Sequence, residues 1–209
     1  MNKYLITGFA GFVSRHFIEY LANKECHCIV QGLDVRMPDF IFDDFKNVKV
    51  DFKKINLLSK ERIKNIIAEF QPNYILHFAS LSSVAYSWKE PVQSFKNDTN
   101  ILLNLLDSTR KLNLNTRVLV IGSSEEYGSV KNEDLPLKEE HKLNPCSPYA
   151  VARMAQEYLS RVYVAHYGLD IVLTRSFNHI GPGQKSNFVV PSIAKQLIAK
   201  KIRQKTRVF

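Results

Sequence analysis

Residues 7–14 read Thr7-Gly8-Phe9-Ala10-Gly11-Phe12-Val13-Ser14, and this stretch decides the fold. It follows a β-rich run at 3–7 and opens a segment, 11–22, whose apolar side chains recur at helical spacing. A glycine turn between strand and helix brings backbone amides to a helix N-terminus, where a pyrophosphate is favoured. The alternative is an ordinary glycine-rich turn. The residues expected at a dinucleotide here are Gly8, Phe9, Ala10, Gly11, Phe12 and Val13.

The rest of the chain alternates between strand and helix patterns. A second strand at 28–33 completes a βαβ unit, whose parallel strands require a crossover connection. Further strands are predicted at 48–50, 74–78, 117–121 and 170–174, and helices at 60–70, 92–112, 190–200 and from Pro148 to Gly168. This alternation predicts an α/β fold with a doubly wound parallel sheet, the Rossmann fold.

Asp34 ends the second predicted strand, where a carboxylate can accept hydrogen bonds from an adenosine ribose. Such a carboxylate favours NAD, because it repels the 2′-phosphate of NADP. Arg36 lies two residues further on and could pair with that phosphate. The cofactor is therefore expected to be NAD or NADP, and Asp34 could also be a turn residue before Pro38.

Composition narrows the class of protein. The chain has 209 residues, 45% of them hydrophobic and 23% charged, which is typical of a globular protein and not of a disordered one. A net charge of +9 favours anionic partners, but no nucleic-acid motif is present. The cysteines, Cys26, Cys28 and Cys146, form no C-x-x-C pair, so we expect no disulfide framework, no metal and a cytoplasmic location. No apolar stretch predicts a membrane span.

A second group of polar residues follows the apolar strand at 117–121. The sequence there is Gly122-Ser123-Ser124-Glu125-Glu126-Tyr127-Gly128, and Tyr149-Ala150-Val151-Ala152-Arg153 opens a later helix. Strand ends at the carboxyl edge of the sheet face the ligand crevice, and residues four apart on a helix share a face. Ser123, Tyr149 and Arg153 are therefore expected to converge on one substrate carbonyl.

In motif order the chain resembles the extended short-chain dehydrogenases/reductases, the family of NAD-dependent epimerases and dehydratases. Within it the chain is most similar to GDP-4-keto-6-deoxy-D-mannose reductases. Besides the glycine turn, the shared motifs are Leu76-His77-Phe78-Ala79-Ser80, residues 122–128, Ser147-Pro148-Tyr149-Ala150-Val151-Ala152-Arg153 and Arg175-Ser176-Phe177-Asn178-His179-Ile180-Gly181-Pro182-Gly183-Gln184.

The resemblance implies NAD(P)-dependent reduction of a nucleotide-linked 4-keto-6-deoxy sugar, GDP-linked in the first instance. Tyr149 would be the proton donor and Ser123 would bond the same oxygen. Glu125 stands where dehydratases place a base, whereas Ser124 replaces their acidic aspartate, which argues against dehydration. A 4-epimerase is an alternative. The resemblance adds Phe78, Ala79, Ser80, Tyr149 and Arg153 at the cofactor, and Ser82, Ser83, Ser124, Glu125, Asn178 and His179 at the substrate.

The chain departs from the family in two respects. Arg153 occupies the position of a lysine that bonds the nicotinamide ribose and lowers the pKa of the tyrosine, and arginine is not an equivalent of lysine. The chain also ends well before members of the family do. We therefore expect a Rossmann domain at 1–178 and a stub of the substrate-binding region at 179–209, an incomplete C-terminal substrate region. A catalytically impaired relative that binds a dinucleotide or a partner chain is the alternative.

Two smaller expectations concern packing. His77 ends a predicted strand and is expected to be a core histidine, and Trp88 either stacks on a ligand or anchors a loop. The helices at 92–112 and from Pro148 carry more apolar surface than one sheet needs, and relatives dimerise through such helices. A homodimer through these helices is the expected assembly.

Overall fold

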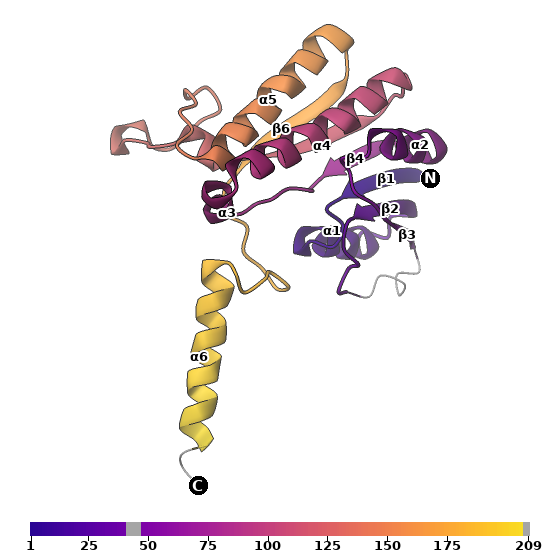
Figure 1. Ribbon diagram of the computed structural model, residues 1–209. Helices are drawn as coiled ribbons and strands as arrows, with labels where there is room; N and C mark the ends of the chain where they lie inside the picture. The colour runs from indigo at the N-terminus through magenta and orange to yellow at the C-terminus, as the bar shows by residue number, and fades with distance from the viewer. Residues whose placement is uncertain (41–46, 207–209) are drawn as a thin grey trace. The chain divides into compact units, whose positions relative to one another are not determined.

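The computed structural model describes residues 1–40 and 47–206, with side chains up to 201. It contains two compact units, Met1–Phe177 and Asn178–Phe209. The first unit carries the sheet and the helices that pack on it. The second carries the helix α6 (Val189–Thr206), which is drawn in yellow in Figure 1.

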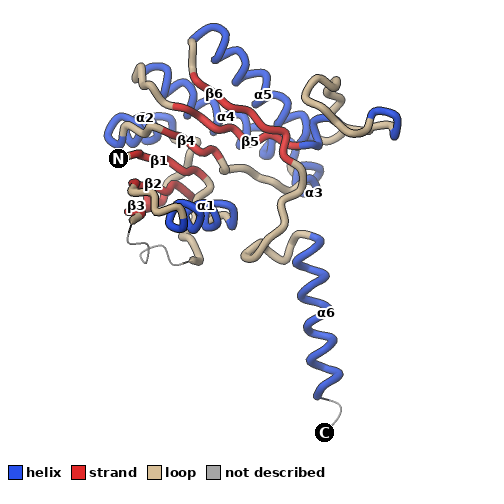
Figure 2. The backbone as a smooth tube through the Cα atoms, turned by 180° about the vertical axis from the view of Figure 1, so that it is seen from behind, coloured by secondary structure: helices blue, strands red, loops and turns tan. Residues whose placement is uncertain are grey.

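A six-stranded sheet forms the centre of the first unit, with strand order β3-β2-β1-β4-β5-β6. All neighbouring pairs are parallel, and Figure 2 shows the strands in red. This confirms the doubly wound parallel sheet, in which the chain reverses its direction of growth between β1 and β4. The strands are β1 (Asn2–Thr7), β2 (Cys28–Asp34), β3 (Val48–Lys54), β4 (Tyr74–His77), β5 (Arg117–Ser123) and β6 (Asp170–Ser176).

Both faces of the sheet are covered, because alternate strand residues point to opposite sides. Leu5 and Ile75 belong to a core cluster shared with α2 (Lys60–Phe70) and α4 (Pro91–Lys111). Their neighbours Ile6 and Leu76 belong to a second cluster shared with α1 (Phe12–Asn23). The near-continuous apolar runs of these strands are thus explained by burial on two sides.

The helix α5 (Pro148–Tyr167) begins and ends at the predicted residues. Ser147 caps it, since its hydroxyl accepts a hydrogen bond from the amide of Ala150 over 3.1 Å, and Pro148 occupies the first turn. Gly168 ends it in the left-handed conformation, with φ +67°. The helix packs on α4 and on β5, so its first turn lies at the edge of the sheet where β5 ends.

Three local features were not predicted. A short helix, α3 (Val84–Lys89), begins after Ser83 and contains Trp88, which is 63% exposed and lies on a helix rather than in a loop. Residues after β5 form the 3-10 helix η1 (Ser124–Tyr127), and a second one, η2 (Asn132–Asp134), lies in the long connection to α5. These elements are too short for a hydrophobic period to reveal them.

Within residues 1–40 and 47–206 no helix has the length and apolar character that crossing a membrane would require.

Candidate functional site

The glycine turn connects β1 to α1 and lies against the end of β4. Gly8 has φ +71°, and a Cβ there would lie 2.6 Å from the amide nitrogen of Ala79 and 2.7 Å from the carbonyl carbon of Phe78. Glycine is therefore required both by its φ and by this close approach. Ser14 bonds back to the turn, because its hydroxyl donates to the carbonyl of Gly8 over 3.2 Å. The turn therefore lies directly against residues 78–79 and is bonded to the first turn of α1.

The backbone amides of this turn have different partners. Phe9 donates to the carbonyl of Leu33 over 3.2 Å, and its ring is fully buried in the core. Gly11 donates to the carbonyl of Gly8 over 2.9 Å. Phe12 and Val13 open α1, and the first amides of a helix have no acceptor within the helix. Of the residues predicted at the cofactor, Phe12 and Val13 therefore offer the N–H groups suited to a pyrophosphate, whereas Phe9 supports the turn from below.

Asp34 ends β2 beside the turn, as predicted. Its carboxylate accepts hydrogen bonds from the amides of Ala10 and Arg36, each over 3.0 Å, and its side chain is buried. These bonds hold the carboxylate at the carboxyl edge of the sheet. Arg36 follows two residues later and its side chain is exposed. The two residues expected to decide between NAD and NADP, Asp34 and Arg36, therefore lie close together.

Ser123 is the last residue of β5 and is 8% exposed. Its hydroxyl accepts a hydrogen bond from the amide of Glu125 over 3.2 Å, so its own proton is available to donate elsewhere. The carboxyl group of Glu126 accepts a hydrogen bond from the amide of Ser123 over 2.7 Å. Together these contacts form a capping box that fixes both the backbone and the side chain of Ser123. Glu125 is exposed and Ser124 is partly buried.

Tyr149 and Arg153 lie one turn apart on α5 and face the same way. The guanidinium carbon of Arg153 is 5.1 Å from the centre of the Tyr149 ring, and both side chains are buried. Arg153 thus places a positive charge beside the ring of Tyr149.

The guanidinium of Arg153 is held by three elements. One terminal nitrogen donates to the carbonyl of Ile121 over 2.9 Å and to the amide oxygen of Gln156 over 3.0 Å, and the other donates to the hydroxyl of Ser80. Its Nε is buried and has no hydrogen-bond partner among the described residues. Arg153 therefore ties α5 to β5 and to the segment after β4, and its buried Nε–H is available to a ligand.

His77 is a core residue, as expected. Its Nδ1 lies 2.8 Å from the hydroxyl of Thr7, and the side chain is 1% exposed. Burial, with a smaller contribution from the charge of Arg153, lowers the pKa of His77 to about 3. The ring is neutral at physiological pH and supports the strand beneath the site.

The remaining predicted residues lie in two places. Ser83 caps α3 by accepting a hydrogen bond from the amide of Tyr86 over 3.2 Å, and the neighbouring Ser82 is exposed. Asn178 and His179 belong to the second unit. The carbonyl of His179 accepts a hydrogen bond from the side chain of Gln184 over 3.0 Å. Their role at a substrate stays a prediction.

A buried charge network beneath Ser123 was missed by the sequence interpretation. Glu126 is fully buried, and its carboxyl lies near that of Glu157 on α5. Glu157 forms a bidentate pair with Arg175 of β6, at 2.7 and 2.8 Å, and also accepts from Arg161 over 2.7 Å. Burial is the main cause that raises the pKa of Glu126 to about 7. No local sequence pattern indicates the network, since its members come from η1, α5 and β6.

Among residues 1–40 and 47–201 no group of three or more His, Cys, Asp or Glu side chains could hold a metal ion. The site instead combines amides suited to a diphosphate with a serine, a tyrosine and a cation at the adjoining strand end. Together with the sheet order, this combination is typical of a dinucleotide-binding Rossmann fold.

Comparison with known proteins identifies the family. The model of the GDP-mannose 4,6 dehydratase family matches residues 5–209, so the chain belongs to this family. The GDP-6-deoxy-D-mannose reductase of Pseudomonas aeruginosa is 29% identical over 196 residues, 94% of this chain and 58% of that protein. The GDP-mannose 4,6-dehydratase of Vibrio cholerae is 31% identical over 206 residues, covering 93% of this chain and 55% of its own length.

Solved structures agree with this assignment. The structure of RMD from Pseudomonas aeruginosa complexed with NADPH has a TM-score of 0.80 at 27% identity, covering 98% of this chain and 63% of its own. The Thermus thermophilus UDP-glucose 4-epimerase complexed with NAD has a TM-score of 0.75 at 29% identity, covering 88% of this chain and 57% of its own. The chain thus spans less than two thirds of the length of these relatives.

Proposed function

We propose that the first unit binds NAD or NADP, with the diphosphate at the N-terminus of α1. The supporting observation is that Gly8 and Gly11 leave no side chain over the turn, while Phe12 and Val13 present amides there. Relatives of similar fold were solved with NADPH and with NAD. Titration of NADH and NADPH fluorescence with the protein tests this proposal, and binding of neither would contradict it.

The choice between the cofactors depends on Asp34 and Arg36. The Asp34 carboxylate is held by two backbone amides and lies where an adenosine ribose would be, which favours NAD. Arg36 is exposed beside it and could pair with a 2′-phosphate. We therefore expect Arg36→Ala to weaken NADPH binding more than NADH binding, and Asp34→Asn to do the reverse.

We infer that the reaction is reduction of a nucleotide-linked 4-keto-6-deoxy sugar, with GDP-4-keto-6-deoxymannose as the first candidate. A reduced dinucleotide held at the amides of Phe12 and Val13 would supply the hydride for the carbonyl carbon. Tyr149 donates its phenolic proton to the carbonyl oxygen and regains a proton from solvent. Ser123 donates a hydrogen bond to the same oxygen, since its own oxygen is already occupied by the amide of Glu125. Arg153 stabilises the tyrosinate left behind.

The substrate side of the proposal uses residues around this pair. Ser124 stands where dehydratases of the family have an aspartate, which favours reduction over dehydration. We propose that Ser82, Ser83, Glu125, Asn178 and His179 contact the nucleotide sugar and that residues 179–209 begin the substrate-binding region. A 4-epimerase is the alternative, and the products distinguish the two activities.

Oxidation of NAD(P)H in the presence of GDP-4-keto-6-deoxymannose is the decisive measurement. Tyr149→Phe removes only the phenolic hydroxyl and is expected to lower the rate by about 10²–10⁴-fold while cofactor binding is retained. Tyr158→Phe is the matched control, because Tyr158 is exposed on the outer side of the same helix. Equal rates for Tyr149→Phe and the unaltered protein would remove Tyr149 from the mechanism.

A catalytically impaired relative is the second candidate, and the contacts of Arg153 favour it. Three of the N–H groups of its guanidinium are used by Ile121, Gln156 and Ser80, which a ribose-binding lysine would not require. Clear cofactor binding without turnover of 4-keto, 4-hydroxy or dehydratase substrates would select this candidate.

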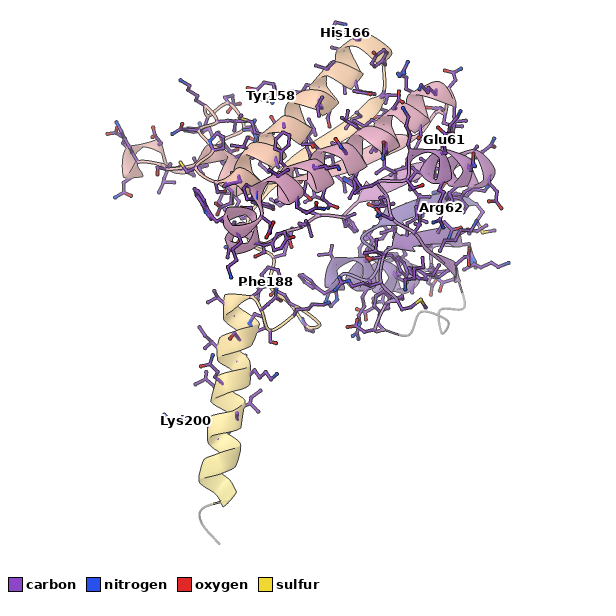
Figure 3. All side chains as sticks on the ribbon, in the orientation of Figure 1. Glu61, Arg62, Tyr158, His166, Phe188 and Lys200 are labelled. Atoms are coloured by element: carbon purple, nitrogen blue, oxygen red, sulfur yellow. The ribbon has the colours of Figure 1, made fainter. Side chains whose placement is uncertain are left out.

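We also propose that the chain forms a homodimer through α4 and α5. Apolar side chains on these adjoining helices are exposed: Val92 by 80%, Phe95 by 42%, Tyr158 by 55% and Val162 by 47%. Tyr158 is labelled on α5 in Figure 3. Burying such side chains against a second copy removes apolar area from water. Sedimentation across micromolar concentrations tests this proposal, and a monomer throughout would contradict it.

A further inference from the structure

We propose that Glu126 is a positioning residue for Ser123. Glu126 is a neutral acid that hydrogen-bonds to Glu157 and holds Ser123 in place, and loss of the Glu126 proton disturbs the position of the Ser123 hydroxyl. The effect on catalysis rests on the proposed role of Ser123. The protonation itself is a property of the folded chain and can be tested without turnover.

Glu126 is attached to Ser123 directly. Its Oε1 accepts a hydrogen bond from the Ser123 amide over 2.7 Å, while the Ser123 hydroxyl accepts one from the amide of Glu125 over 3.2 Å. The backbone carbonyl of Glu126 accepts from the amide of Asn144 over 3.0 Å, which ties the loop before α5 to the same residue. Any displacement of Glu126 therefore changes the position of Ser123.

The second carboxyl oxygen of Glu126, Oε2, is the expected position of the proton. Oε2 is buried and has no hydrogen-bond partner among the described residues, although the carboxyl of Glu157 is within reach of Glu126. Two carboxylates cannot hydrogen-bond to each other, because neither has a proton to donate. A proton on Oε2 converts this contact into an O–H···O bond and satisfies the buried oxygen.

Glu157 is the ionised member of the pair. Its Oε1 accepts from Arg175 and Arg161, each over 2.7 Å, and its Oε2 accepts from the Nε of Arg175 over 2.8 Å. These hydrogen bonds from arginine are the main cause that lowers the pKa of Glu157. Within the described part of the chain no arginine donates a hydrogen bond to Glu126, so the shared proton stays on Glu126.

The groups around Glu126 come from three elements. Glu157 and Arg161 lie on α5, Arg175 lies on β6, and Tyr127 follows Glu126 in η1. The remaining terminal nitrogen of Arg175 donates to the Tyr127 hydroxyl over 3.2 Å and to the carbonyl of Glu139 over 2.8 Å. Arg175 is thus committed elsewhere. The hydrogen bond from the Ser123 amide and the charge of Arg175 lower the pKa of Glu126, but burial and Glu157 outweigh them and raise it to about 7.

The proton of Glu126 is therefore lost in the neutral range. Above that pH two buried carboxylates face each other, and their repulsion pushes η1 away from α5. Since the amide of Ser123 is bonded to Glu126, the serine hydroxyl moves with it. Turnover is expected to fall as the pH rises through about 7.

Infrared difference spectroscopy tests the protonation. The unaltered protein should show the carbonyl stretch of a buried carboxylic acid that fades with a midpoint near pH 7. Glu126→Gln should lack this band, and Glu69→Gln, a matched change at a 74% exposed glutamate of α2, should keep it. Absence of the band from the unaltered protein would overturn the proposal, even if Glu126→Gln does not fold. Persistence of the band in Glu126→Gln would overturn it as well.

Two further measurements test the link to Ser123. The amide nuclear magnetic resonance of Ser123 should titrate with the midpoint of the carboxyl band, and a signal that does not move would overturn the positioning role. In active protein, kcat should fall above about pH 7 for the unaltered chain and stay level for Glu126→Gln, with KM unchanged. Identical pH profiles would overturn the link to Ser123. If no turnover is found, the proposed reaction fails, and the amide titration still decides the role of Glu126.

Discussion

The glycine turn and the end of β5 lie at the same edge of the sheet but are built differently. The turn is held by contacts between backbone atoms: the amide of Phe9 donates to the carbonyl of Leu33, and Gly8 packs against the backbone of residues 78–79. At the end of β5, buried polar side chains bond to the strand: Arg153 donates to the carbonyl of Ile121, and Glu126 accepts from the amide of Ser123. The first region should respond to added volume, and the second to lost charge.

The largest effect on folding is expected from the buried ion pair. Arg175→Met would leave Glu157 buried without its bidentate partner and should lower the free energy of unfolding by about 3–5 kcal/mol. Arg117→Met removes an arginine from the exposed pair with Asp170 and should cost about 0–1 kcal/mol. Urea unfolding of both variants measures the contrast, and equal losses would mean that burial does not matter here.

The turn should be broken by a single methyl group. Gly8→Ala combines a φ of +71° with three backbone atoms within 2.8 Å of the new Cβ, and should cost about 2–5 kcal/mol and abolish dinucleotide binding. Gly168→Ala has a similar φ of +67° but nothing within 4 Å, so about 1–2 kcal/mol is expected. Thermal unfolding with and without NADH compares them. Similar losses of stability in the two variants would mean that the positive φ, and not the steric contact at Gly8, causes the whole effect.

The two regions should also differ in the sign of their pH dependence. The folded pKa of His77, about 3, lies below the ordinary 6.5, so the unfolded chain binds the extra proton and stability falls as pH drops below 6.5. The folded pKa of Glu126, about 7, lies above the ordinary 4.5, so its contribution to stability falls as pH rises from 4.5 to 7.

Each group contributes at most about 1.4 kcal/mol per pH unit within its own range. His77→Gln should flatten the acid side of the stability curve and leave the neutral side unchanged, whereas Glu126→Gln should do the opposite. Chemical unfolding at a series of pH values gives both slopes. An acid slope that survives His77→Gln would assign it to another group.

The smallest effect on folding is expected at Arg153. Arg153→Lys loses the bonds to Ile121 and Gln156 and should cost about 1–2 kcal/mol, while it restores the residue that the family uses at the ribose. NADH should then bind more tightly. Arg161→Lys is the control, because Arg161 is 57% exposed, donates to Glu157 and lies over the ring of Tyr158. Weaker NADH binding by Arg153→Lys would show that the guanidinium is itself the cofactor contact.

Much of this site could be predicted from short stretches of sequence. The glycine turn, Asp34 at the end of β2, Ser123 at the end of β5 and the facing pair Tyr149 and Arg153 all depend on spacing within one or two elements. Such spacing survives in the fold because helix and strand periods are local properties. The helix α3 escaped because six residues are too few to show a period.

The sequence by itself determined the parallel sheet and the order of its motifs, since strand burial and the glycine turn leave local patterns. Only the tertiary structure decided that Glu126, Glu157 and Arg175 meet beneath Ser123, and that Arg153 reaches Ser80. These residues come from separate elements, and their charges depend on burial. Burial is a property of the packed fold, and no single stretch of sequence contains it.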